Sequence, residues 1–130
     1  MLDLETLGTA PGCVVLSIGA VFFDPLVGLG AELYGVLSLQ SCKDNGLKVD
    51  INTQQWWSKQ SDEAQQVLRD AEAPEAAPLV DGLQAFTKWI KETRSADVFV
   101  WGNGSDFDQP IITAAYNAIA KTIHGEFFNA

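Results

Sequence analysis

Two carboxylates near the start of the chain, Asp3 and Glu5, have the type and spacing that a divalent metal site needs. They lie two residues apart in a short apolar segment that favours a β-strand, where such side chains project from the same face. Two like charges this close repel each other unless a cation lies between them. Carboxylate oxygens alone suit Mg²⁺ or Mn²⁺. The alternative is an edge strand on which both acids face water, the commoner situation for charged side chains.

The strands that must position these acids can be read from the hydrophobic pattern. Strands are predicted over Leu2–Thr6, Val14–Phe23 and Glu32–Gln40, with a further short strand at Val98–Trp101. Val14–Phe23 is a nearly continuous apolar run rich in Val, Ile and Phe, so we expect it to be buried on both faces. The first three strands would form an antiparallel meander, and the fourth would add a parallel strand.

Helices are predicted between the third and fourth strands and after the fourth. Their ranges are Gln54–Lys59 after a start at Asn52-Thr53, Ser61 to about Ala71, Leu79–Thr93, and a last helix from residues 107–109 to about Ala120. Leu79, Leu83, Phe86 and Ile90 recur at helical spacing and predict a core-facing stripe. A meander followed by strand and helix units indicates an α/β fold with a mixed sheet.

Length and composition bound the protein class. The 130 residues fit one domain, and 47% hydrophobic with 19% charged residues is an ordinary globular composition. No apolar run approaches the roughly 20 residues of a membrane helix, and acids rather than basic residues follow Met1, so we expect a cytoplasmic protein with no membrane partner. The formal net charge of −9 argues against an extended nucleic-acid surface. It is compatible with a small pocket in which metal ions screen carboxylates from a phosphodiester.

Three segments carry a family resemblance. The first is Asp3-Leu-Glu-Thr-Leu-Gly-Thr-Ala-Pro-Gly12, continued by Leu16-Ser-Ile-Gly-Ala-Val-Phe-Phe-Asp-Pro25. The others are Trp101-Gly-Asn-Gly-Ser-Asp-Phe-Asp108 and Trp56-Trp57-Ser-Lys-Gln-Ser-Asp-Glu-Ala64. Together they resemble the DnaQ-like (DEDDh) 3'-5' exonuclease superfamily, and more narrowly its bacterial and phage exoribonuclease-type members.

The resemblance implies a ribonuclease H-like fold and a two-metal site for Mg²⁺ or Mn²⁺. Asp3, Glu5 and Asp108 match the family's catalytic, metal-binding acids. Asp106 is a nearby competitor for the third position, but we expect it only to complement the positive end of the last helix. The implied reaction is hydrolysis of phosphodiesters from the 3' end of single-stranded RNA or DNA to nucleoside monophosphates. The choice between RNA and DNA stays open.

The resemblance also implies residues that border the terminal nucleotide. These are Leu7, Gly8, Thr9 and Asn103. The alternative is a plain surface loop for the first three and a plain turn for the last. Trp56 and Trp57 either stack on bases or belong to the core, and helical spacing favours the core.

The family's third motif, a general-base His followed five positions later by an Asp, is absent from this sequence. The single histidine, His124, is followed at that distance by Asn129, and it comes only sixteen residues after Asp108. We expect His124 in a surface loop and the domain, residues 1–130, to be incomplete at its C-terminal end, with little or no hydrolysis by this chain alone. Missing core elements would expose apolar surface and favour a homo-oligomer.

Two other functions remain open at the level of sequence. One is a non-catalytic remnant of the same fold that binds nucleotides or a partner chain. The other is a ribonuclease H-like endonuclease, whose products would be oligonucleotides rather than mononucleotides.

Overall fold

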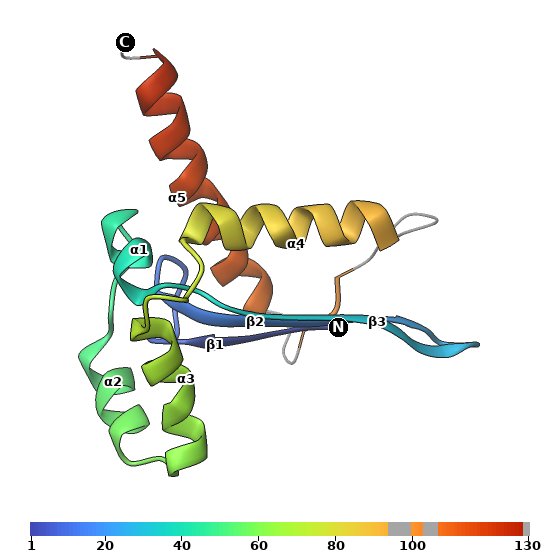
Figure 1. The fold of residues 1–130 in the computed structure, drawn as a ribbon, viewed down its shortest axis with the longest axis horizontal. Coiled ribbons are helices and arrows are strands. Elements are labelled where there is room, and N and C mark those ends of the chain that lie inside the picture. Colours follow the sequence, from blue (N-terminus) through green and yellow to red (C-terminus); the bar gives the residue numbers. More distant parts are fainter. Residues whose placement is uncertain (94–99, 103–106, 129–130) are drawn as a thin grey trace.

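The fold is a three-stranded antiparallel sheet with helices on both sides (Figure 1). The computed structural model describes residues 1–93, 100–102 and 107–128, with side chains described up to residue 121. In these ranges the elements are β1 (Leu2–Thr6), β2 (Val15–Asp24), β3 (Gly28–Val36), α1 (Leu39–Asp44), α2 (Ile51–Ser58), α3 (Asp62–Glu72), α4 (Leu79–Thr93) and α5 (Asp108–Phe128). The predicted α/β class and antiparallel meander are confirmed.

The sheet has the order β1-β2-β3, with β2 in the centre. Asp3 lies opposite Gly19 and Glu5 opposite Ser17 in the β1–β2 register. Part of the predicted parallel strand, residues 98–99, lies outside the described residues. Gly102 forms an isolated parallel bridge with Leu2, and the Leu2 amide donates to the Trp101 carbonyl at 2.7 Å. The parallel strand and the ribonuclease H-like sheet therefore stay predictions.

Burial along β1 alternates as its sequence predicts. Leu2, Leu4 and Thr6 are buried, whereas Asp3 is exposed and Glu5 is half-buried. The two acids therefore share the face of the strand that is not packed into the core.

The prediction for β2 is only half right. Val15–Ile18 are buried, but Gly19–Phe22 are half-buried, and Phe23 and Asp24 are exposed. The cause is that β2 and β3 extend together beyond the helices as a hairpin, visible at one end of the molecule in Figure 1. The apolar run of β2 therefore continues onto a part of the sheet whose two faces are not both covered by helices.

Helices cover the sheet unevenly. α4 lies over one face, and its residues Leu79, Leu83 and Phe86 are buried, as the helical spacing predicts. α2 and α3 lie on the other side, at the end away from the hairpin (Figure 1). α5 packs against β1 and β2, and its residues Ile111 and Ala115 are buried in the core.

The boundaries of the third strand and of α2 differ from the predicted ones. The third strand is β3, Gly28–Val36, and the predicted C-terminal part of it forms α1 instead, because the Ser38 hydroxyl accepts from the Ser41 amide and caps a helix. α2 starts at Ile51 because the Asp50 carboxylate accepts from the next amides and caps it.

α5 is longer than predicted and runs through residue 124 to Phe128. The expectation of a loop around His124 is therefore wrong. Across the described part of the chain, none of the helices has both the length and the apolar character needed to cross a membrane.

Candidate functional site

Asp108 joins the end of the sequence to the opening strand. It is the first residue of α5 and is 1% exposed. Its Oδ1 accepts a hydrogen bond from the Leu4 amide at 3.3 Å, across a sequence separation of 104 residues. Leu4 lies between Asp3 and Glu5, so this bond brings the third predicted acid to the strand that carries the other two.

The direction of the bond follows from the sheet. The Leu2 amide points away from β2 and donates to Trp101, and the Leu4 amide, two residues on, points the same way. Asp108 therefore accepts from an amide on the edge of β1 that is not paired with β2. It gives this buried N–H a hydrogen-bond partner, which buried backbone amides generally have.

The charges of neighbouring acids raise the pKa values of Asp3 and Glu5. Partial burial raises the pKa of Asp3, and the negative charge of Asp108 raises this pKa further. Partial burial also raises the pKa of Glu5, followed in size by the charges of Asp3 and then Asp108. A bound cation would relieve this repulsion, which is the electrostatic setting of a metal site.

The acids do not form a closed ligand cage in this structure. Among the described residues, no three His, Cys, Asp or Glu side chains stand close enough to hold one metal ion. The raised pKa values of Asp3 and Glu5 are compatible with this spacing of the acids. Charges act over a Debye length of about 8 Å, whereas a ligand must approach Mg²⁺ to about 2.0–2.1 Å. The donor chemistry suits Mg²⁺ or Mn²⁺, and the side chains would have to converge to bind it.

A pocket of about 520 Å³ opens beside Glu5. Its walls come from β1, the loop after it, α2 and the start of α5, and they are formed by Leu4, Glu5, Thr6, Gly8, Thr9, Asp50, Asn52, Thr53, Trp56, Trp57 and Phe107. Its volume falls in the range of about 300–1,000 Å³ typical of small-molecule sites. Glu5 therefore belongs both to the acidic cluster and to a pocket large enough for a nucleotide.

Two neighbouring tryptophans have different environments. Trp57 is 4% exposed, and its indole Nε1–H donates to the Thr6 carbonyl at 2.8 Å. Trp56 is 55% exposed and meets Trp57 edge to face with ring centroids 5.3 Å apart. Trp57 is therefore a core residue that fixes the end of β1 against α2, while Trp56 offers an open aromatic ring at the pocket.

The predicted nucleotide-binding residues separate into three groups. Gly8 and Thr9 line the pocket. Leu7 is buried in the core, with its amide bonded to Val14 and its carbonyl to Asp50, and its role at the nucleotide stays a prediction. Asn103 lies outside the described residues.

Gly8 allows the loop to approach its neighbour closely. A Cβ at this position would lie 2.4 Å from the Cys13 Cβ, a separation that real Cβ atoms essentially never show. The Gly8 carbonyl also accepts from the Thr6 hydroxyl at 2.7 Å. The predicted loop thus curls back on itself and gives the pocket one wall.

Besides Leu4 and Thr6 of β1, four pocket residues were not predicted as functional: Asp50, Asn52, Thr53 and Phe107. The first three form the capped start of α2, and the polar cluster before the Trp pair was a usable signal for the helix but not for a pocket. Phe107 precedes Asp108 directly, and only the fold shows that it faces Glu5's pocket.

Two candidates remain, Asp106 and His124. Asp106 lies outside the described residues. His124 lies on α5, and at about 1.5 Å of rise per helical residue it is roughly 24 Å along the axis from Asp108. Its side chain is not described.

Comparison with known proteins gives one match. A family model described as the 3'-5' exoribonuclease Rv2179c-like domain matches residues 1–130. No curated protein and no solved structure matches the chain.

Proposed function

The chain belongs to the 3'-5' exoribonuclease Rv2179c-like domain family, and from this premise we propose that it is a metal-dependent 3'-5' exonuclease domain. Asp3, Glu5 and Asp108 would hold Mg²⁺ or Mn²⁺ at a two-metal site. The observation that carries the proposal is the Leu4–Asp108 hydrogen bond, which brings the third acid to the strand of the first two.

Each acid has a distinct part in the proposed site. Asp3 and Glu5 project from one face of β1, and Asp108 is held at its edge by the Leu4 amide. When bound, divalent ions at such a site lower the pKa of a water nucleophile and stabilise the leaving 3' oxygen. The protein's contribution is to keep three carboxylates near one another at an electrostatic cost that the cation offsets.

The pocket would hold the terminal nucleotide. Gly8 and Thr9 supply backbone and hydroxyl groups on one side, and the exposed ring of Trp56 offers a base-stacking surface on the other. Because Glu5 lines the same pocket, a phosphate entering it without a cation meets a like charge. Nucleotide binding should therefore require the metal.

A test of the proposal is titration calorimetry of Mn²⁺ into the chain, followed by adenosine monophosphate in the presence and absence of Mn²⁺. We expect saturable Mn²⁺ binding that is lost in Asp3→Asn and Asp108→Asn, and nucleotide binding only with Mn²⁺. Glu63→Gln, a change of an exposed acid on α3, is the matched control and should bind Mn²⁺ normally. Equal Mn²⁺ binding in all variants would contradict the proposed site.

The second candidate is a non-catalytic remnant that binds nucleotides. Two observations favour it: the acids stand too far apart to share an ion as described, and the only histidine lies far along α5 from Asp108. Metal-dependent nucleotide binding without nucleotide release from single-stranded RNA would support the remnant. Release of mononucleotides would support the enzyme, and release of oligonucleotides would indicate an endonuclease.

A further inference from the structure

A row of three residues crosses the sheet from the acid site. Asp3 of β1 lies opposite Gly19 of β2, and Gly19 lies opposite Tyr34 of β3. Residues directly opposite each other in antiparallel strands project from the same face of the sheet. Tyr34 therefore shares its face with Asp3, and also with Glu5, which lies two residues further along β1.

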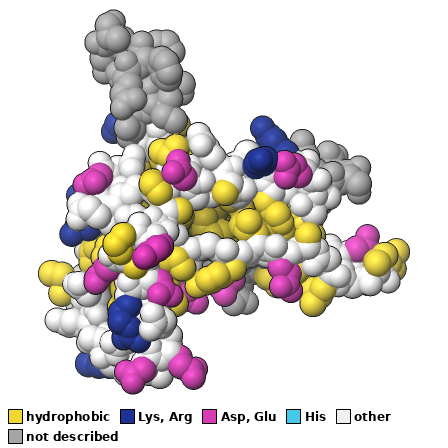
Figure 2. Space-filling view, in the orientation of Figure 1, with side chains coloured by type: hydrophobic (Ala, Val, Ile, Leu, Met, Phe, Trp, Pro, Cys, Tyr) yellow, Lys and Arg dark blue, Asp and Glu magenta, His cyan; other side chains and the backbone are white. Residues whose placement is uncertain are grey.

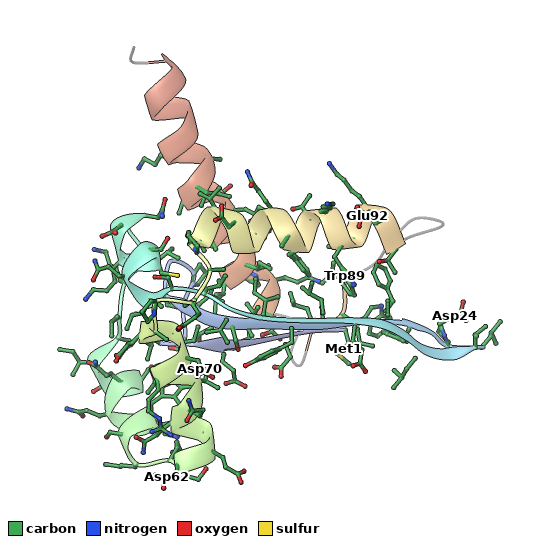
Figure 3. All side chains as sticks on the ribbon, in the orientation of Figure 1. Met1, Asp24, Asp62, Asp70, Trp89 and Glu92 are labelled. Atoms are coloured by element: carbon green, nitrogen blue, oxygen red, sulfur yellow. The ribbon has the colours of Figure 1, made fainter. Side chains whose placement is uncertain are left out.

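This face is the one that α4 does not cover. Phe22 lies three residues after Gly19 in β2 and so projects from the opposite face. There it packs against Trp89 of α4, with ring centroids 4.7 Å apart. Figure 3 shows Trp89 between α4 and the sheet, and Asp62 and Asp70 of α3 on the other side of the sheet.

The face of Tyr34 is covered at one end and open in the middle. α2 and α3 lie on this side at the end away from the hairpin (Figure 1), where α3 packs against β2 and β3. Ser17, opposite Glu5, is 1% exposed, whereas Tyr34, in the next row, is 65% exposed. We call the open surface over Gly19 and Tyr34 the sheet platform.

Gly19 keeps the floor of the sheet platform low. A Cβ at Gly19 would lie 3.5 Å from the Asp3 carbonyl oxygen and 3.9 Å from Tyr34 Cδ2, so the tyrosine ring lies close to the glycine. Both are ordinary contact distances, and the φ of Gly19 is not positive, so neither packing nor backbone conformation demands a glycine here. A glycine inside a strand often marks the close approach of a ligand or another backbone.

The chemistry of the sheet platform suits an uncharged ring. None of the three described strands contains Lys or Arg, and Asp3 and Glu32 add negative charge on the same face as Tyr34. In the view of Figure 2, Lys and Arg side chains lie around the helices, and acidic and hydrophobic side chains lie along the sheet. A phosphate would be repelled here, whereas a nucleobase can stack on the exposed tyrosine through its π-face.

The sheet platform and the pocket lie on different sides of the acids. The pocket opens at the end of β1 beyond Glu5, and Gly8, Thr9 and Trp56 line it. Tyr34 lies two strands away from Asp3, which is about 10 Å at 4.7–4.9 Å per strand. A 3'-5' exonuclease cuts between the terminal nucleotide and the one before it, so these two nucleotides must lie on opposite sides of the acids.

We propose that the base of the second nucleotide from the 3' end stacks on Tyr34, over the space that Gly19 leaves open. This inference rests on the proposed function and extends its substrate from one nucleotide to a single strand of at least two. Tyr34 selects single strands, because a base that stacks on it has to leave the stack of a duplex. It accepts any base, since every base has a π-face.

The test compares three ligands by titration calorimetry in the presence of Mn²⁺. They are adenosine monophosphate, the dinucleotide pApA, and the same dinucleotide with an abasic ribose in place of its 5' adenosine. A phosphorothioate link between the two nucleotides slows hydrolysis during the titration. We expect the wild type to bind pApA at least about fivefold more tightly than the abasic dinucleotide, the lower limit for one stacked base.

Substitutions on the sheet platform separate stacking from binding in the pocket. Tyr34→Ala should abolish the preference for pApA over the abasic dinucleotide, and the matched control Tyr34→Phe keeps the ring and should keep the preference. Gly19→Ala adds a methyl group that the protein accommodates at contact distance but that occupies the space beneath the base, so it should reduce the preference. Trp56→Ala should weaken the binding of all three ligands alike, because Trp56 lines the pocket of the terminal nucleotide.

Binding of adenosine monophosphate distinguishes failure of this inference from failure of the proposed function. If the mononucleotide binds with Mn²⁺ but the wild type does not distinguish pApA from the abasic dinucleotide, only the role of Tyr34 is overturned. A preference that survives in Tyr34→Ala overturns it as well. If adenosine monophosphate does not bind with Mn²⁺, the proposed nucleotide pocket is wrong, and the role of Tyr34 is lost with it.

Discussion

Asp108 combines a proposed ligand role with a structural contact, and two substitutions separate these roles. Asp108→Asn keeps an oxygen that accepts from the Leu4 amide, whereas Asp108→Ala leaves that buried N–H without it. An unsatisfied buried donor costs about 1–3 kcal/mol. We expect Asp108→Ala to lower the free energy of unfolding by that amount, Asp108→Asn to lower it much less, and both to lose Mn²⁺ binding. Urea unfolding and calorimetry measure the two effects. Equal destabilisation by both substitutions would contradict the role given to the Leu4 bond.

Charge repulsion at the site predicts that Asp3→Asn stabilises the metal-free protein but abolishes its stabilisation by Mn²⁺. Removing one of the mutually repelling acids should raise the melting temperature of the metal-free protein at neutral pH, because the pKa values of Asp3 and Glu5 are both raised in the fold. The wild type should gain stability on adding Mn²⁺, by about 2.7 kcal/mol at a hundred times the dissociation constant. Asp3→Asn should not. Thermal melts with and without Mn²⁺ give both results.

The raised pKa values of Asp3 and Glu5 also determine how the stability of the fold changes with pH. The folded protein takes up protons on Asp3 and Glu5 at a pH where the unfolded chain is still ionised. Their contribution to stability therefore rises as pH falls through the raised values, and it levels off below the ordinary values of 3.8 and 4.5. The stability advantage of Asp3→Asn over the wild type should shrink over this window. A constant difference in the free energy of unfolding from neutral pH to about pH 4 would contradict it.

Residue types and short spacings predicted part of the site. The alternation of β1 put Asp3 and Glu5 on one face, and the position of Pro110 put the start of the last helix within a residue or two of Asp108. The sequence could not predict that Leu7 is buried, since its burial depends on Val14 and Asp50 pairing with its backbone.

At the scale of elements, a buried hydrogen bond ties α2 to β1. Trp57→Phe removes the N–H that reaches the Thr6 carbonyl and keeps most of the ring volume. We expect it to lower the free energy of unfolding by about 1–3 kcal/mol. Trp56→Phe changes an exposed ring and should alter stability by less than about 0.5 kcal/mol.

The two tryptophans should also separate in binding. Trp56→Ala should weaken metal-dependent nucleotide binding by the loss of a stacking surface, worth about 1–3 kcal/mol per base. Fluorescence quenching by adenosine monophosphate with Mn²⁺ measures this. Unchanged affinity in Trp56→Ala would remove Trp56 from the pocket's function.

Elements with local signals were predicted well, and those without them were not. α4 has the predicted bounds because its apolar stripe is strong, and α3 starts after Ser61, whose hydroxyl accepts from Ala64. α1 was missed because it has only six residues, and its cap, Ser38, stands within an alternating apolar stretch that reads as strand. Short helices of this kind are stabilised by tertiary packing, here the burial of Cys42, rather than by their own pattern.

At the scale of the whole molecule, the fold brings Asp108 to the strand that carries Asp3 and Glu5, beside a pocket. No histidine lies near them among the described side chains. We therefore expect it to release nucleotides from single-stranded RNA slowly or not at all in the presence of Mn²⁺. A general base contributes typically about 10²–10⁴-fold to rate. Clear, EDTA-sensitive release of mononucleotides by this chain would show the expectation to be wrong.

The layers could be predicted in outline, because a meander followed by amphipathic helices has few arrangements. The projecting hairpin could not, since Phe22 and Phe23 read as core residues in the sequence. Whether an apolar residue is covered depends on which helices reach that part of the sheet, and α2 and α3 lie at the other end (Figure 1).

The Leu4–Asp108 bond also joins two residues that are synthesised at different times. β1 leaves the ribosome before α5, so its buried amide at Leu4 has to wait for a carboxylate 104 residues later. At about 5–20 residues per second, that interval is roughly 5–20 s. A nascent chain therefore emerges with Asp3 and Glu5 before their third acid, so a site that needs all three acids can form only after residue 108 has left the ribosome.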